Sequence, residues 1–148
     1  EVLLFLHADT DLPEGALAAV DQALAGGRDW GRFDVRIQGR SRWLPMVAAL
    51  MNLRSRLTGI ATGDQAIFVR REVFEALGGF AEQPLMEDVE LTRRLRGRTR
   101  PACLRLKVRT SGRRWDERGT WRTIWLMWRL RWLYWRGVGA EQLARMYR

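Results

Sequence analysis

Acidic side chains and a histidine follow directly after an apolar run near the start of the sequence. Residues 2–6 (VLLFL) are followed by His7, Asp9 and Asp11. Two carboxylates spaced two residues apart can hold a hard cation such as Mg²⁺ or Mn²⁺, usually together with phosphate oxygens of a substrate. Each residue also has a structural explanation: a helix cap for Asp11, a turn for Asp9, and a structural hydrogen bond for His7. We favour the cap for Asp11 and ligand binding for Asp9, and both explanations stand for His7.

A second acidic group, Glu87 and Asp88, lies at the start of a predicted helix, after a loop that contains Pro84. Acidic residues at this position stabilise a helix through its dipole, and this explanation suffices when the pair is read alone. A carboxylate that a helix aims at the rim of a cleft can also act as a general base.

Basic and aromatic side chains meet at Arg113, Arg114 and Trp115. Guanidinium groups can bind a diphosphate, and an indole can stack on a sugar or on a lipid-linked acceptor. The alternative explanation is a solvated basic loop.

Strands and helices are predicted to alternate along the chain, which is typical of an α/β domain. The uninterrupted apolar run at residues 2–6 indicates a buried strand of a parallel sheet. Ligands bind at the carboxyl ends of such strands, where His7 and Asp9 would lie. Further strands are expected at residues 31–37, 66–69 and 102–108, helices at 13–25, 44–57, 72–77, 86–97, 120–136 and 140–148, and a polar loop at 111–119.

The composition suits one globular domain, because 47% of the 148 residues are hydrophobic. The net charge of +9 comes almost entirely from arginine, and Lys107 is the only lysine. Such a charge favours anionic partners (phosphates, nucleic acid or an acidic membrane surface), although a GC-rich genome also enriches arginine. The single cysteine, Cys103, excludes an internal disulfide and fits a reducing compartment.

Five tryptophans between residues 121 and 135 recur at steps of four, three, four and three, which places them in one stripe of a helix. Arg122, Arg129 and Arg136 form a second row at a spacing of seven. Either this helix packs between the domain and a partner, or it lies at a membrane interface, with tryptophan at the headgroups and arginine near anionic lipid. The arginines inside the segment argue against a membrane-spanning helix.

The segments LHADT, GDQAIFVRREVFEALGGF, MEDVELTRRLR and SGRRW, in this order, resemble family 2 glycosyltransferases of the GT-A fold. In particular, they resemble a bacterial subgroup with a HADT motif, over essentially the whole chain. The resemblance implies an α/β fold in which residues 1–117 are the C-terminal portion of a Rossmann-like GT-A domain and residues 118–148 an amphipathic helical extension. It also implies that the nucleotide-binding half would precede residue 1, so we expect this chain alone to bind a sugar nucleotide poorly.

The resemblance also implies roles for individual residues. Asp9 matches the metal-coordinating aspartate of the family's Asp-x-Asp motif, and His7 replaces the first aspartate. Asp88 matches the proposed catalytic base. Arg114 and Trp115 match the end of a Gln-x-x-Arg-Trp motif. The residues predicted to contact the donor diphosphate or the acceptor are His7, Asp11, Asp64, Gln65, Glu87, Arg114 and Trp115, and Ser111 stands where the motif has glutamine.

The predicted function is therefore the transfer of a sugar from a nucleotide-sugar donor to an acceptor hydroxyl, with Mg²⁺ or Mn²⁺ and with inversion. A lipid-linked acceptor and an anionic membrane surface at residues 118–136 are further predicted partners, in a cytoplasmic protein that lies peripherally on the inner face of the membrane. The alternatives are a nucleic-acid-binding module, a nucleotidyltransferase and a catalytically inactive remnant. Nucleic acid is not expected as a partner, because no helix-turn-helix, zinc or RNA-recognition signature is visible.

Overall fold

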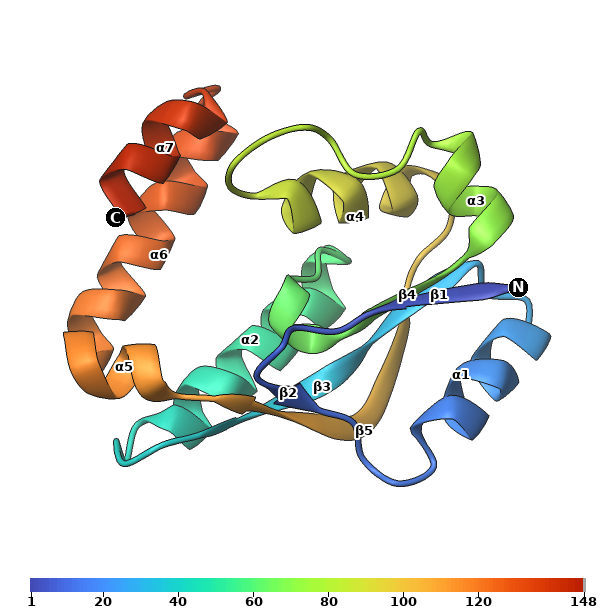
Figure 1. Ribbon diagram of the computed structural model, residues 1–148, viewed down its shortest axis with the longest axis horizontal. Helices are drawn as coiled ribbons and strands as arrows, with labels where there is room; N and C mark the ends of the chain where they lie inside the picture. Colours follow the sequence, from blue (N-terminus) through green and yellow to red (C-terminus); the bar gives the residue numbers. More distant parts are fainter. Residues whose placement is uncertain (148) are drawn as a thin grey trace.

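The fold is a curled, mixed five-stranded sheet with helices packed around it (Figure 1). The computed structural model describes residues 1–147. Its elements, in chain order, are β1 (Val2–Phe5), β2 (Thr10–Asp11), α1 (Ala16–Ala25), β3 (Trp30–Gln38), α2 (Leu44–Thr58), the short 3-10 helix η1 (Gly63–Gln65), β4 (Ile67–Arg70), α3 (Arg71–Ala76), α4 (Glu87–Arg98), β5 (Ala102–Ser111), α5 (Arg113–Arg118), α6 (Thr120–Trp135) and α7 (Ala140–Tyr147).

The strands lie in the order β1-β4-β3-β5-β2. Only β3 and β5 run parallel, whereas β1 with β4, β3 with β4, and β2 with β5 are antiparallel. The prediction of an α/β fold is confirmed in this coarse form. The expected parallel sheet is wrong, because most neighbouring strands are antiparallel.

Strand β1 is an edge strand, not the buried inner strand predicted from its apolar run. It pairs with β4 alone among the described residues, and Leu6, beyond its end, is exposed. Leu3 and Phe5 pack against one hydrophobic core and Leu4 against another, so both faces of the strand are partly covered while one edge stays open. Continuous hydrophobicity therefore overstated the burial of this strand, because it cannot distinguish an inner from an edge position.

The curl of the sheet follows from a short connection. β1 and β2 lie at opposite edges of the sheet, yet only residues 6–9 join them. Five strands laid flat would separate the edges by roughly 19 Å. The link spans at most roughly 17 Å when fully extended, and a turn from His7 O to Thr10 N, at 3.1 Å, shortens it further. The sheet must therefore curl, and this brings residues 6–9 beside the end of β5, where Ser111 N donates to Asp9 O at 3.3 Å.

Three local predictions are corrected by the structure. Residues 113–118 form the helix α5 and not a loop, and Arg113 pairs there with Glu117 one turn later. Asp11 belongs to β2 and does not cap α1, whose N-cap is Gly15. A bulge opposite Phe33 and Asp34 interrupts the expected alternation of β5, because it adds two residues to that strand and leaves Leu106 exposed.

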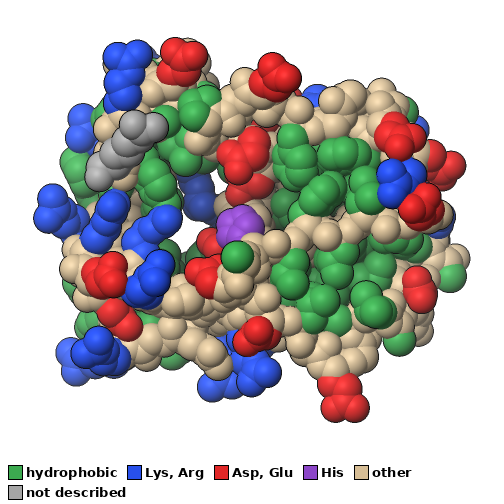
Figure 2. Space-filling view, in the orientation of Figure 1, with side chains coloured by type: hydrophobic (Ala, Val, Ile, Leu, Met, Phe, Trp, Pro, Cys, Tyr) green, Lys and Arg blue, Asp and Glu red, His purple; other side chains and the backbone are tan. Residues whose placement is uncertain are grey.

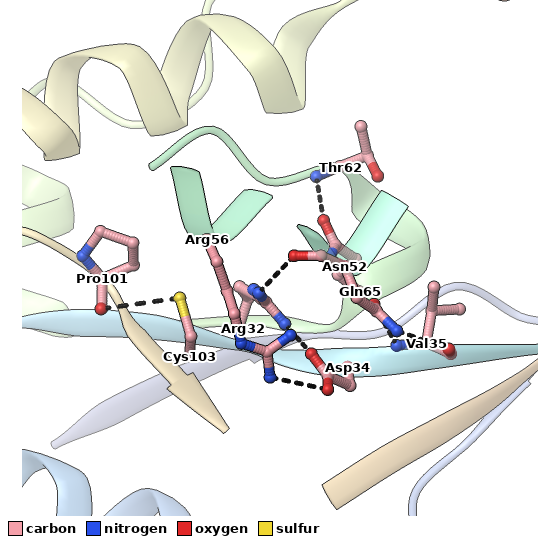
Figure 3. Close-up of polar contacts among 9 residues, drawn as sticks. All are labelled: Arg32, Asp34, Val35, Asn52, Arg56, Thr62, Gln65, Pro101 and Cys103. Atoms are coloured by element: carbon pink, nitrogen blue, oxygen red, sulfur yellow. Dashed lines mark hydrogen bonds and ion pairs between the residues drawn. The ribbon is translucent and has the colours of Figure 1, made fainter. Parts of the chain in front are cut away.

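Two hydrophobic cores hold the sheet. The first joins α1 and α2 to β3, and the second joins α3 and α4 to β4 and Trp30. Under α2, the side chain of Arg32 on β3 is fully buried and pairs with Asp34, which also receives Arg56 Nη2 at 2.7 Å (Figure 3). Asn52 accepts from Val35 N at 2.9 Å, so polar contacts as well as apolar packing join α2 to β3.

Helices α5, α6 and α7 stand together at one side of the sheet (Figure 1). A third core of Met86, Leu130 and Leu143 attaches α6 and α7 to the segment before α4. The predicted tryptophan helix is confirmed, and its tryptophans are exposed. No helix within residues 1–147 combines the length and apolarity needed to cross a bilayer. The division into units at residues 117 and 118 stays a prediction.

Candidate functional site

A cleft of about 490 Å³ opens where the sheet edge, α4 and the C-terminal helices meet. The space-filling view shows this hollow, with the histidine and carboxylates on one wall and basic side chains on the other (Figure 2). Seven of the nine predicted site residues line this one cleft: His7, Asp9, Asp64, Glu87, Asp88, Arg114 and Trp115. They come from four segments far apart in the chain, and the curled sheet brings them together.

His7 and Asp64 contact each other at the cleft, with 3.3 Å between Nδ1 and Oδ1, and form an ion pair when the imidazole is protonated. The hydrogen bond to Asp64 raises the pKa of His7, burial opposes the shift, and the charges of Asp88 and Asp9 add to it. The imidazole lies directly against Gly63, where a Cβ atom would stand 2.2 Å from His7 Nε2. A glycine at this position is therefore what allows the histidine to reach its partner.

Asp88 is the most strongly held carboxylate of the cleft. Its Oδ2 accepts from Gly63 N and its Oδ1 from Val89 N, both at 2.6 Å. Burial raises the pKa of Asp88, the two backbone donors oppose this, and the neighbouring acids Glu87 and Asp64 raise it further. A fixed carboxylate with an elevated pKa that still lines a cleft has the properties of a general base.

The chain enters α4 through a left-handed residue. Met86 has φ 64°, a left-handed conformation that is energetically unfavourable for any residue other than glycine. Its side chain is buried in the third core. Glu87 and Asp88 then occupy the first turn of α4, and Arg96 and Arg98 its last turn. The predicted match of this helix to its dipole is confirmed. The acidic first turn of α4 can therefore stabilise the helix through its dipole and at the same time place Asp88 in the cleft.

Arginines form the wall opposite the carboxylates. Arg113, Arg114 and Arg118 from α5 and Arg131 from α6 line the cleft, together with Glu117, which pairs with Arg113. The Arg114 guanidinium lies 4.7 Å from the centre of the Tyr147 ring, and Arg118 Nη1 donates to Tyr147 O at 3.1 Å. The end of α7 thus orients this basic wall. An anion bound here would face several guanidinium groups, with the acids across the cleft.

The remaining predicted site residues have other surroundings. Asp11 is exposed on β2 and does not line the cleft. The Gln65 side chain is fully buried, and its Oε1 accepts from Thr62 N at 3.3 Å in a capping box of η1. Gln65 therefore shapes the turn that carries Gly63 and Asp64, without reaching the cleft. Trp115 lines the cleft and also packs against the first core.

Sequence reasoning missed the supporting residues of the site. Burial lowers the pKa of the Arg54 guanidinium, and the charge of nearby Asp88 opposes this shift. Its Nε and Nη2 atoms have no hydrogen-bond partner among the described residues. Arg54 lies in the middle of α2, and no local pattern points to it. The sequence did not point to Tyr147 either, because its contact with Arg114 joins the end of α7 to α5, which lies about thirty residues earlier in the chain.

The donor atoms of the cleft fit a hard cation. Asp9, Asp64, Glu87 and Asp88 supply carboxylate oxygens, which Mg²⁺ and Mn²⁺ prefer, and no thiol lines the cleft. No three His, Cys, Asp or Glu side chains within residues 1–147 are close enough to hold a metal by themselves. A cation here would take one or two protein carboxylates and complete its shell with water or substrate phosphate, as Mg²⁺ commonly does.

Comparisons with known proteins returned no relative: no protein-family model, no curated protein and no solved structure matches this chain.

Proposed function

We propose that this chain carries the catalytic side of a glycosyltransferase, which moves a sugar from a nucleotide-sugar donor to an acceptor hydroxyl. The observation that carries the proposal is the position of Asp88. It is a half-buried, backbone-held carboxylate of raised pKa in a cleft whose opposite wall is rich in arginines. The GT-A assignment belongs to the same proposal and is supported by the four sequence segments that meet at this cleft.

The reaction needs a base and a site for a departing anion. Asp88 accepts the proton of the acceptor hydroxyl while that oxygen forms a bond to the anomeric carbon. The bond between the anomeric carbon and the diphosphate breaks on the opposite side, and the diphosphate leaves with the electron pair. One such displacement inverts the anomeric centre. Arg114 and its neighbours on the basic wall offset the charge that builds on the diphosphate.

The carboxylate of Asp9 is the proposed metal ligand, because it lines the cleft without an ion-pair partner among residues 1–147. A bound Mg²⁺ or Mn²⁺ would supply additional positive charge for the diphosphate. His7 is committed to Asp64 and holds the segment that carries Asp9 against η1. In this proposal His7 is a positioning residue, which explains how it can replace the aspartate of the family motif.

The test uses the complete gene product that contains these residues, a panel of UDP-, GDP- and dTDP-sugars, and release of the nucleoside diphosphate as the readout. Asp88→Asn should lower turnover by about 100- to 10,000-fold, the usual contribution of a general base. Asp21→Asn is the matched control, because it makes the same chemical change on an exposed position of α1 outside the cleft.

Near-normal turnover of Asp88→Asn would remove Asp88 as the base. Absence of donor cleavage with every sugar nucleotide, in the presence of Mg²⁺ or Mn²⁺, would overturn the proposed activity itself.

A further inference from the structure

Helix α6 exposes a continuous tryptophan surface, which we call the Trp–Arg face. Its tryptophan side chains are between 55% exposed, at Trp132, and 81% exposed, at Trp135. Monomeric soluble proteins rarely leave a large contiguous apolar patch open to water, and such patches mark interaction sites. The residues of the Trp–Arg face are Trp121, Trp125, Trp128, Trp132 and Trp135, with Arg122, Arg129 and Arg136 beside them.

The arginines are part of this surface. At 100° per residue the five tryptophans lie within an arc of roughly 80° on the helix, and the three arginines flank one side of that arc. Arg129 stacks on Trp125 and Arg136 on Trp132, each with its guanidinium carbon 5.2 Å from the ring centre. All three arginines are exposed. The face therefore combines flat apolar rings with positive charge, and α6 contains no acidic residue.

The rest of the fold holds this face outward. On the opposite side of α6, Leu130 is fully buried in the third core. At the start of the helix, Trp121 packs edge-on against Trp43 at 5.2 Å, and Thr120 Oγ1 lies 2.6 Å from Ser41 Oγ. The helix cannot rotate to bury its tryptophans without breaking these contacts.

We propose that the Trp–Arg face docks on the surface of an anionic lipid bilayer, with α6 lying in the plane of the interface. Indole rings prefer the headgroup level, and arginine next to them is attracted to anionic lipid. The net charge of +9 acts in the same direction. The helix does not combine the length and apolarity needed to cross the bilayer, so it would lie on the membrane and not span it.

Two other occupants fit this surface less well. A second copy of the chain would place two positively charged helices against each other with no acidic residue of α6 to complement them, which is unfavourable. Single-stranded nucleic acid is usually held in a positively charged groove with aromatic rings inside it. The Trp–Arg face is instead the convex outer side of one helix.

Docking has a consequence for the cleft, because Met127, Leu130 and Arg131 on the inner side of the same helix line it. The cleft would then lie about one helix diameter, roughly 10 Å, from the lipid surface. An acceptor hydroxyl on a lipid-linked molecule could reach it there. This statement about the acceptor rests on the proposed function, whereas docking itself does not.

The experiment is flotation of the full chain with vesicles of phosphatidylcholine alone or mixed with phosphatidylglycerol, at low and high salt. One variant combines Trp125→Gln, Trp128→Gln and Trp132→Gln. A second combines Arg122→Gln, Arg129→Gln and Arg136→Gln. The matched control combines Leu50→Gln, Leu53→Gln and Leu57→Gln, which are exposed apolar residues of another helix, α2. Circular dichroism confirms that each variant is folded.

We expect salt-sensitive binding to the anionic vesicles, loss of binding in the tryptophan variant, and roughly 100-fold weaker binding in the arginine variant. The leucine control should bind like the parent chain. Absence of flotation with anionic vesicles overturns the proposal. Binding that survives in the tryptophan variant overturns it as well, and so does an equal loss of binding in the leucine control. Self-association or binding to single-stranded DNA through this face, without vesicle binding, also overturns it. None of these readouts depends on sugar transfer, so the docking proposal and the proposed function can fail separately.

Discussion

Replacing Asp34, a buried residue at the middle of β3, should destabilise the fold strongly. Its carboxylate lies between two arginines: Arg32, whose side chain is wholly buried, and Arg56, whose side chain is 32% exposed. The Asp34 side chain is itself only 9% exposed. Asp34→Asn keeps the shape of the side chain but removes the charge that neutralises Arg32, so a guanidinium is left buried without a counterion.

The structure sets the expected size of this effect. Breaking a buried ion pair by removing one partner costs about 3–5 kcal/mol. An asparagine can still accept one hydrogen bond, and Arg32 Nη2 keeps its bond to Asn52 O at 3.2 Å. We therefore expect a loss at the low end, about 3 kcal/mol of unfolding free energy. Arg56→Gln is the matched control, and because this arginine is partly in solvent its loss should be about 1 kcal/mol or less.

Equilibrium unfolding in urea, followed by far-UV circular dichroism, measures both losses. Domains are commonly stable by about 5–15 kcal/mol, so the Asp34→Asn variant should still fold at low urea. The difference between parent and variant should change little with salt, since a buried pair is weakly screened. The reasoning is refuted if Asp34→Asn lies within about 1 kcal/mol of the parent chain, or if Arg56→Gln is equally costly.

Three further predictions concern the cleft. His7 is the only histidine, so its proton NMR titration is unambiguous, and Asp64→Asn should move its raised pKa toward the ordinary value. The pKa of His7 is higher in the folded state, so the stability that this pair contributes is present at acidic pH and is lost as the pH rises through the raised pKa. The unfolding free energy of Asp64→Asn should therefore differ from that of the parent only on the acidic side. Gly63→Ala places a methyl group against the imidazole and should separate His7 from Asp64, and an unchanged His7 titration in this variant would show that the contact does not exist. If Asp88 is the base, its raised pKa should shift the acidic limb of the kcat/KM profile above the usual range of an aspartate, and a limb in the ordinary range would exclude that role.

Local patterns in the sequence were sufficient for most of the individual elements. The apolar spacing of residues 44–57 and the glycine that follows predicted α2, and Gly59 does end that helix in a left-handed conformation. The acidic and basic ends of α4 and the tryptophan spacing of α6 were equally informative. These signals act between residues one or two turns apart, so a short window of sequence contains them completely.

The misassigned parts depend on partners that are distant in the sequence. Whether β1 is an inner or an edge strand depends on what lies beside it, and the bulge of β5 appears only when its register with β3 is known. Helix α5 lies in a polar segment without apolar periodicity, and contacts such as that of Asp116 with Arg40 N and Ser41 N, at 2.8 and 3.0 Å, fix its place.

The sequence by itself determined the inventory of the site: the acids, the histidine, the arginines and the tryptophan stripe. Tertiary structure alone decided which of them meet. The short link at residues 6–9 curls the sheet and brings Asp9 to the cleft that Asp88 and Arg114 also line, while Gln65 turns inward and Asp11 stays outside. The raised pKa of Asp88 and the burial of Arg32 have the same origin. Both are properties of the atoms that surround a side chain after folding, and residues that are far away in the sequence supply most of those atoms.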